Sequence, residues 1–254
     1  MENDFFPSHH DEERHIATSG NGSVPAPKPD KQAASTQDVA TESAIPETRT
    51  VRIIDKIATA FSWILVPLNM PLFGLWFLFG LSILTVLPTA FKWELTGIFF
   101  GLDIIVPMGL IFLLKWFGLV DDLGLNGRKE RLIPYLISIA VLVGSGYWCQ
   151  RLGLPLWVAG FYYGGAVAGA FNLIVNFRWK ISAHAAAMAG VLALLVRLWT
   201  MGNTFGPIET WILIWIVLTG LLGASRIWLG RHTPMQVLCG SIVGFVAVYF
   251  MTFI

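Results

Sequence analysis

Residues 211–250 read WILIWIVLTGLLGASRIWLGRHTPMQVLCGSIVGFVAVYF, two apolar runs separated by a short polar segment. A helix of about 20 apolar residues spans the ~30 Å hydrocarbon core of a bilayer. The runs at 208–224 and 234–254 are of helix length and lack the alternation of polar and apolar residues that marks a barrel strand. The stretch therefore predicts two membrane-crossing helices joined by a turn that contains Arg226, Arg231 and His232.

The same pattern continues toward the N-terminus. The chain is 55% hydrophobic and 13% charged, with a mean hydropathy of +0.66, which excludes an ordinary soluble domain. The block 57–70 is short and is broken by proline, so we expect an interfacial or re-entrant helix there. The fold class is all-α, a polytopic membrane bundle of six or seven transmembrane helices with one short interfacial or re-entrant helix. The remaining candidate spans are about 72–91, 95–117, 132–149, 155–176 and 184–201.

The first fifty residues differ from the rest of the chain. Residues 1–50 are rich in Pro, Ser, Thr, Gly and charge and show no apolar periodicity, so we expect a disordered tail before a membrane-embedded domain at 51–254. Residues 56–254 hold twelve Lys or Arg and six Asp or Glu. This positive excess suits an anionic substrate or an anionic lipid surface, and loop cations that only set the topology account for it equally well.

Three polar clusters interrupt the apolar background, at 120–134, 177–184 and 225–232. Two candidate spans separate each cluster from the next. Because an even number of crossings returns a chain to the same face, we expect all three clusters to meet at one membrane surface. Which face this is stays open, because the cations that would decide it are also candidate ligands. In the glycine-rich segment 160–169 (GFYYGGAVAG), we expect close helix contacts.

Within residues 56–254 the chain has only two histidines, His184 and His232, and each lies in a polar cluster. Metal sites usually need three or more His, Cys, Asp or Glu ligands, and the acids of the clusters are confined to Asp121, Asp122 and Glu130. We therefore expect no metal or other cofactor. Phosphoryl transfer fits the pattern better, because fixed cations stabilise its transition state while one histidine attacks and a second protonates the leaving alcohol.

Three motifs carry a family resemblance. SRIWLGRH at 225–232 has the spacing of the third motif of the type 2 phosphatidic acid phosphatase superfamily, and ISAHAAAMAG at 181–190 resembles its second motif. GRKERLIP at 127–134 looks like a degenerate form of the first. The sequence differs from the family in three places: Ile181 and Ala183 replace proline and glycine of the second motif, two residues separate Arg131 from Pro134, and Gln236 replaces the third-motif aspartate.

The resemblance implies roles for the matching positions. His232 would form a phosphohistidine, and His184 would protonate the leaving oxygen. Gln236 would orient the nucleophile through its carbonyl group, without the negative charge of an aspartate. Helix capping by Ser182, loop anchoring by the cations and a surface position for Gln236 stay as alternatives. The phosphate ligands would be Arg226, Ser182 and Arg131, with Arg128 and Lys129 as alternates to Arg131, and Lys180 by its position.

The sequence thus predicts an integral membrane phosphatase, in a bacterial inner membrane, that acts on a lipid phosphate or diphosphate such as phosphatidate, phosphatidylglycerophosphate or a polyprenyl diphosphate. Its partners would be this substrate and membrane lipids, with no nucleic acid. Two alternatives stay open. The first is a catalytically degenerate protein that binds lipid headgroups or a partner, and the second is a component of a transporter or flippase.

Overall fold

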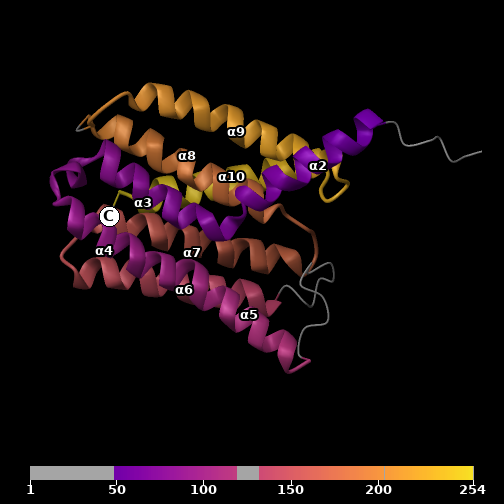
Figure 1. Cartoon of the computed structure of the whole chain (residues 1–254), viewed down its shortest axis with the longest axis horizontal. Coiled ribbons are helices and arrows are strands. Elements are labelled where there is room, and N and C mark those ends of the chain that lie inside the picture. The colour runs from indigo at the N-terminus through magenta and orange to yellow at the C-terminus, as the bar shows by residue number, and fades with distance from the viewer. Residues whose placement is uncertain (1–48, 119–131, 203, 254) are drawn as a thin grey trace, which may run out of the picture. The chain divides into compact units, whose positions relative to one another are not determined.

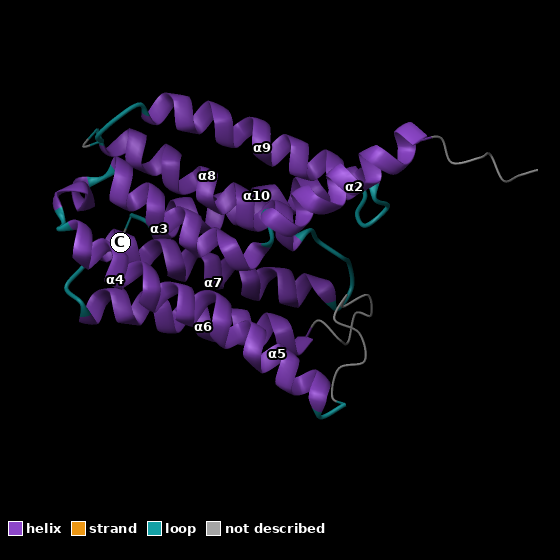
Figure 2. Cartoon of the chain, in the orientation of Figure 1, coloured by secondary structure: helices purple, strands orange, loops and turns teal. Residues whose placement is uncertain are grey.

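The computed structural model describes residues 49–118, 132–202 and 204–253. Every regular element in these ranges is a helix, as predicted (Figure 2). The elements in chain order are α2 (Arg49–Ile64), η1 (Pro67–Asn69), α3 (Met70–Leu81), η2 (Ile83–Val86), α4 (Thr89–Phe100), η3 (Gly101–Ile105), α5 (Val106–Trp116), α6 (Leu132–Arg151), α7 (Leu156–Asn176), α8 (Ala183–Met201), α9 (Ile208–Trp228) and α10 (Pro234–Met251).

Seven helical stretches in the described ranges are long and apolar enough to cross a membrane, which agrees with the predicted bundle of six or seven. Their outer surfaces carry large apolar side chains, such as Phe112, Val217 and Phe250, that are more than half exposed. Such a surface suits lipid rather than water. The seven stretches are Arg49–Leu81, Thr89–Trp116, Leu132–Arg151, Leu156–Asn176, Ala183–Met201, Ile208–Trp228 and Pro234–Met251.

The N-terminal helices differ from the expected boundaries. The predicted span 72–91 is wrong, because α3 ends at Leu81 and a new helix begins at Thr89. Ser82 ends α3: its hydroxyl donates to the Leu78 carbonyl oxygen at 2.6 Å and accepts from the Leu84 amide at 3.1 Å. The short helix predicted at 57–70 corresponds to α2, which is separated from α3 by the turn at η1. Its placement at a membrane interface stays a prediction.

Helix α10 packs closely against α8 and α7, and glycines make this possible. A side chain at Gly240 would collide with the Ser182 carbonyl oxygen, and one at Gly244 would collide with the backbone of Ala186 in α8. On the α7 side, Gly160 and Gly164 are approached by the backbone of Met251 and Val248 of α10. The close contacts predicted from the glycine-rich segment 160–169 are therefore confirmed.

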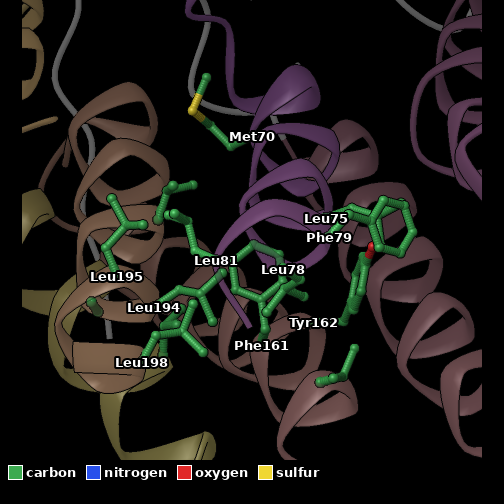
Figure 3. Packing of buried hydrophobic residues seen from close by; sticks show 14 of the residues in the cluster. Met70, Leu75, Leu78, Phe79, Leu81, Phe161, Tyr162, Leu194, Leu195 and Leu198 are labelled. Atoms are coloured by element: carbon green, nitrogen blue, oxygen red, sulfur yellow. The ribbon is translucent and has the colours of Figure 1, made fainter. Parts of the chain in front are cut away.

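The apolar core lies where α3, α7 and α8 meet (Figure 3). Leu75 and Leu78 of α3 are fully buried, as are Leu194 and Leu195 of α8. Both leucines lie in the C-terminal half of α8, and the cluster continues toward the start of that helix through Val191 and Met188.

Two of the three polar clusters meet at one end of the bundle, as the count of crossings predicted. The α7–α8 and α9–α10 connections lie side by side at the right of Figure 1. The backbone amide of Ser182 donates to the backbone carbonyl oxygen of Gln236 at 3.1 Å. The Lys180 ammonium donates to the backbone carbonyl oxygen of Arg231 at 2.9 Å. The remaining cluster is the one at 120–134, and its residues 120–131 lie outside the described residues.

The contact between α8 and α10 can be tested at Gly244. We expect Gly244→Ala to lower the apparent melting temperature of the purified protein, because the new methyl group forces apart two helices that touch through their backbones, at a cost of about 1–3 kcal/mol. Gly220→Ala in α9 is the matched control, since no atom lies within 4 Å of the added methyl group. An equal melting temperature for both variants, measured by tryptophan fluorescence, would contradict this packing.

Candidate functional site

A cavity of about 430 Å³ lies inside the bundle and reaches the end where the polar connections meet. His184, Arg226 and His232 all line it, although they come from α8, α9 and the α9–α10 connection. Most of the remaining wall is apolar and is built by α2, α3, α5, α6, α7 and α8. The structure therefore brings the two predicted histidines and the predicted arginine to one polar mouth above an apolar interior.

The turn after α9 explains the spacing between Arg226 and His232. Gly230 has a φ angle of 62°, a left-handed conformation that glycine adopts at no steric cost after a helix. The chain then folds back, so that the amides of Arg231 and His232 both donate to the Arg226 carbonyl oxygen, at 3.0 and 3.3 Å. This turn returns His232 to the last turn of α9, where Arg226 lies.

Gln236 contacts the predicted nucleophile directly. Its side-chain carbonyl oxygen lies 3.2 Å from Nδ1 of His232 and also accepts the Thr233 amide at 3.2 Å. In return the Thr233 hydroxyl accepts the Gln236 amide, which completes a capping box at the start of α10. Because the glutamine oxygen is an acceptor, Nδ1 of His232 must carry the proton, and Nε2 keeps its lone pair. Gln236 is therefore not a surface glutamine without contacts.

His184 occupies the first turn of α8 and faces the cavity. Its imidazole interacts electrostatically with Arg226, with His232 and with the backbone of Ser62 in α2. Helix α2 is itself held against α9, since the indole of Trp228 donates to Asp55 at 2.8 Å. The contact with Ser62 was not expected from the sequence, because no motif links the block 57–70 to the polar clusters.

Two predicted phosphate ligands are engaged elsewhere. Ser182 is fully buried, and its hydroxyl accepts the Ala185 amide at 3.3 Å, which is the helix-capping alternative that the sequence left open. Lys180 connects the two polar loops through its contact with the Arg231 carbonyl oxygen. Both residues support the frame of the site, and their contacts with phosphate stay predictions.

Residues 127–131 of the first motif lie outside the described residues, which begin again at Leu132. Arg128, Lys129 and Arg131 are therefore not placed. The motif's last residue, Pro134, is buried in the first turn of α6 and lines the cavity. Pro134 therefore shares the cavity with the two histidines.

Three further polar residues of the cavity wall were not expected from the sequence. Asp103 of η3 and Tyr162 and Asn172 of α7 line it, and each is at most 3% exposed. Asp103 alone carried a detectable signal, as an acidic residue inside the apolar block 95–117, since an ionisable group within a span is a functional candidate. Tyr162 and Asn172 carried none, because uncharged polar residues are common in membrane helices.

In the described part of the chain, no group of three or more His, Cys, Asp or Glu side chains is placed to hold a metal ion. The acids Asp121, Asp122 and Glu130 lie outside that part. The expectation of a site without metal therefore stays a prediction.

Comparison with known proteins identifies one relationship. The family model of the PAP2 superfamily matches residues 176–254, which hold the second and third motifs but not residues 127–134. No curated protein and no solved structure shows significant similarity to the chain. At the level of the superfamily, the match indicates a phosphatase that acts on phosphate esters, and with the seven apolar helices it indicates an integral membrane protein. The matched segment carries His184, Arg226 and His232, and it confirms the resemblance of this chain to the type 2 phosphatidic acid phosphatase superfamily.

Proposed function

We propose that this protein is a metal-independent membrane phosphatase that hydrolyses a lipid phosphate or diphosphate through a phosphohistidine. One observation carries the proposal: His184, Arg226 and His232 line the polar mouth of a cavity whose other walls are apolar. An amphiphile fits this arrangement, because its charged headgroup meets the cations while its chain stays out of water. The positive excess of residues 56–254 favours an anionic headgroup as well.

Binding of the headgroup depends on Arg226. Its guanidinium group stays protonated and offers several N–H donors in one plane, which match the oxygens of a phosphate group. The turn after α9 holds the Arg226 backbone through two hydrogen bonds, so the side chain starts from a rigid position. A positioned cation of this kind lowers the energy of a transition state in which negative charge spreads over three oxygens.

His232 is the nucleophile in this mechanism. Its Nε2 lone pair forms a bond to phosphorus, and the bond between phosphorus and the lipid oxygen breaks. His184 gives its proton to that oxygen, so the lipid leaves as a neutral alcohol, or as a monoester when the substrate is a diphosphate. A water molecule then attacks the phosphohistidine and gives a proton to His184. The bond between Nε2 and phosphorus breaks, and inorganic phosphate leaves.

Gln236 distinguishes this site from one with a carboxylate. Its oxygen holds the same tautomer and ring orientation of His232 that a carboxylate would hold. It supplies no negative charge, so the positive charge that develops on the imidazole during attack is stabilised less. We therefore expect a phosphatase that is slower than one with an aspartate. The same neutral contact favours the second candidate function, a protein that binds lipid phosphate headgroups without hydrolysing them.

The decisive assay is phosphate release from phosphatidate, phosphatidylglycerophosphate and a polyprenyl diphosphate by the purified protein with chelator present. We expect release from at least one of them, and a loss of at least about a thousandfold in His232→Ala, because the proposed phosphohistidine forms on this side chain. A headgroup-binding protein would release none. Equal rates of phosphate release for the wild type and His232→Ala would refute the assignment of His232 as the nucleophile.

Gln236 gives a graded test of how the nucleophile is held. We expect Gln236→Glu to raise kcat, because a carboxylate of the same length stabilises the imidazolium ion, and Gln236→Leu to lower it by roughly 10–100-fold. Thr233→Ala is the control, because it weakens the capping box and leaves the Gln236 contact with the imidazole in place. Equal kcat values for Gln236→Leu and Thr233→Ala would mean that Gln236 only caps α10 and does not orient His232.

The two arginines of the third motif are predicted to differ. We expect Arg226→Ala to lower kcat/KM by about a hundredfold or more, because a charged contact with the phosphate group is lost. Arg231→Ala removes the same charge from the same turn, and we expect less than a threefold change, since Arg226 and not Arg231 lines the cavity. Similar losses for the two variants, measured on the same lipid, would contradict this assignment.

A further inference from the structure

The deep end of the cavity holds polar groups that the proposed hydrolysis does not use. Asp103 is 3% exposed and Tyr162 is fully buried, and both line the cavity. The Ser145 hydroxyl of α6 donates to Oδ1 of Asp103 at 2.6 Å, while Oδ2 of Asp103 and the hydroxyl of Tyr162 have no hydrogen-bond partner. Leaving two such oxygens buried and unpaired is costly, so their presence at one place requires an explanation.

The backbone and the packing hold these groups in position. Asp103 lies in η3, a π-helical turn between α4 and α5, and such turns occur frequently at functional sites. The ring of Tyr162 stacks on Phe99 of α4, with ring centres 5.2 Å apart, and it lies among the apolar side chains of the core (Figure 3). Asp103 and Tyr162 interact electrostatically but do not hydrogen-bond to each other. Each of the two oxygens can therefore still form a hydrogen bond with a third group.

The distance from the polar mouth suits a lipid chain. Along α7 the cavity wall extends from Phe161 to Asn172, which corresponds to about 16 Å at the rise of an α-helix. Asn172 lies near the end of α7 that adjoins the α7–α8 connection, whereas Phe161 and Tyr162 lie near its start. A chain whose phosphate group lies at the histidines can thus reach the polar pair with its far part, through apolar walls.

The chemistry of the pair selects one kind of group. A hydroxyl is both a donor and an acceptor, so it can satisfy Asp103 and Tyr162 together whether or not the carboxyl group is ionised. A methyl terminus satisfies neither oxygen, and a carbonyl group donates no proton to a carboxylate. A bound metal cation needs about six oxygen ligands, which is more than the two unpartnered oxygens and Ser145 provide.

We propose that this pair, Asp103 and Tyr162, binds a hydroxyl group on the hydrophobic chain of the substrate, so that the enzyme prefers hydroxylated lipid phosphates. The inference rests on the proposed function, because it places the phosphate group at the two histidines. In this arrangement the mouth of the cavity recognises the headgroup, and its deep end recognises a polar group on the chain. Water bound at the pair is the competing occupant.

The test uses two phosphonates that cannot be hydrolysed, dodecylphosphonate and ω-hydroxydodecylphosphonate, with the full chain in phosphatidylcholine nanodiscs. Titration calorimetry gives their Kd values without any turnover. We expect the hydroxylated ligand to bind about tenfold more tightly to the wild type, as one well-made hydrogen-bonded contact predicts. Tyr162→Phe, which removes one oxygen atom, should reduce this preference to about threefold or less.

Tyr163→Phe is the matched control, since it makes the same change one residue along α7 and Tyr163 does not line this cavity. We expect it to keep the full preference. Asp103→Asn is the second variant, used if Tyr162→Phe does not fold, and it should weaken the preference in the same direction. Equal binding of the two phosphonates to the wild type, or an unchanged preference in the folded variant, would overturn the inference and leave water as the occupant.

Phosphate release from dodecyl phosphate separates this result from the proposed function. Phosphate release without a preference for the hydroxylated phosphonate would support the proposed phosphatase function and contradict only the proposed binding of a hydroxyl group. If neither phosphonate binds and no phosphate is released, both conclusions fail.

Discussion

The close contact between α8 and α10 is the constraint on which the site depends. Gly240 and Gly244 let the two helices touch through their backbones, and the Ser182 amide donates to the Gln236 carbonyl oxygen at the same end. His184 is the second residue of α8, and His232 lies two residues before Pro234, where α10 begins. A larger residue at either glycine would separate the helices, and with them the two histidines. The geometry of the proposed site therefore depends on glycine at positions 240 and 244.

The side-chain oxygen of Gln236 makes two contacts, one with the helix terminus and one with His232. As the third residue of α10 it completes the capping box with Thr233, and its oxygen also accepts from Nδ1 of His232. The helix terminus and the orientation of the nucleophile are thus coupled, because one carbonyl oxygen serves both. We expect a change at this position to act on helix stability and on the proposed catalysis together, so variants of Thr233 are needed to separate the two effects.

The cavity joins two environments with different energetics. At the mouth, cations favour an anion that remains partly hydrated, and further in, apolar walls favour a chain that leaves water. Asp103 and Tyr162 interrupt this apolar surface at its deep end. Because each unsatisfied polar group in a membrane bundle costs free energy, the fold keeps such a pair most readily where a ligand compensates the cost.

The sequence by itself determined the helical class, the approximate number of spans and the convergence of the second and third polar clusters. These follow from apolar run length and from parity, and neither depends on side-chain packing. Through the resemblance of the third motif, it also pointed to Gln236 as the residue beside His232, the proposed nucleophile. It did not predict the end of α3 at Leu81, because the Ser82 contacts that stop the helix are too local for a count of apolar residues to detect.

Only the tertiary structure decided which polar residues share the cavity. Asp103 and Tyr162 come from segments that look like ordinary apolar spans, and they share the cavity because helices distant in sequence pack together. The structure also showed that Ser182 caps α8 and that Lys180 holds a neighbouring loop. A polar residue in a membrane sequence indicates that some partner must exist, because an unsatisfied group is costly, whereas the identity of that partner depends on packing.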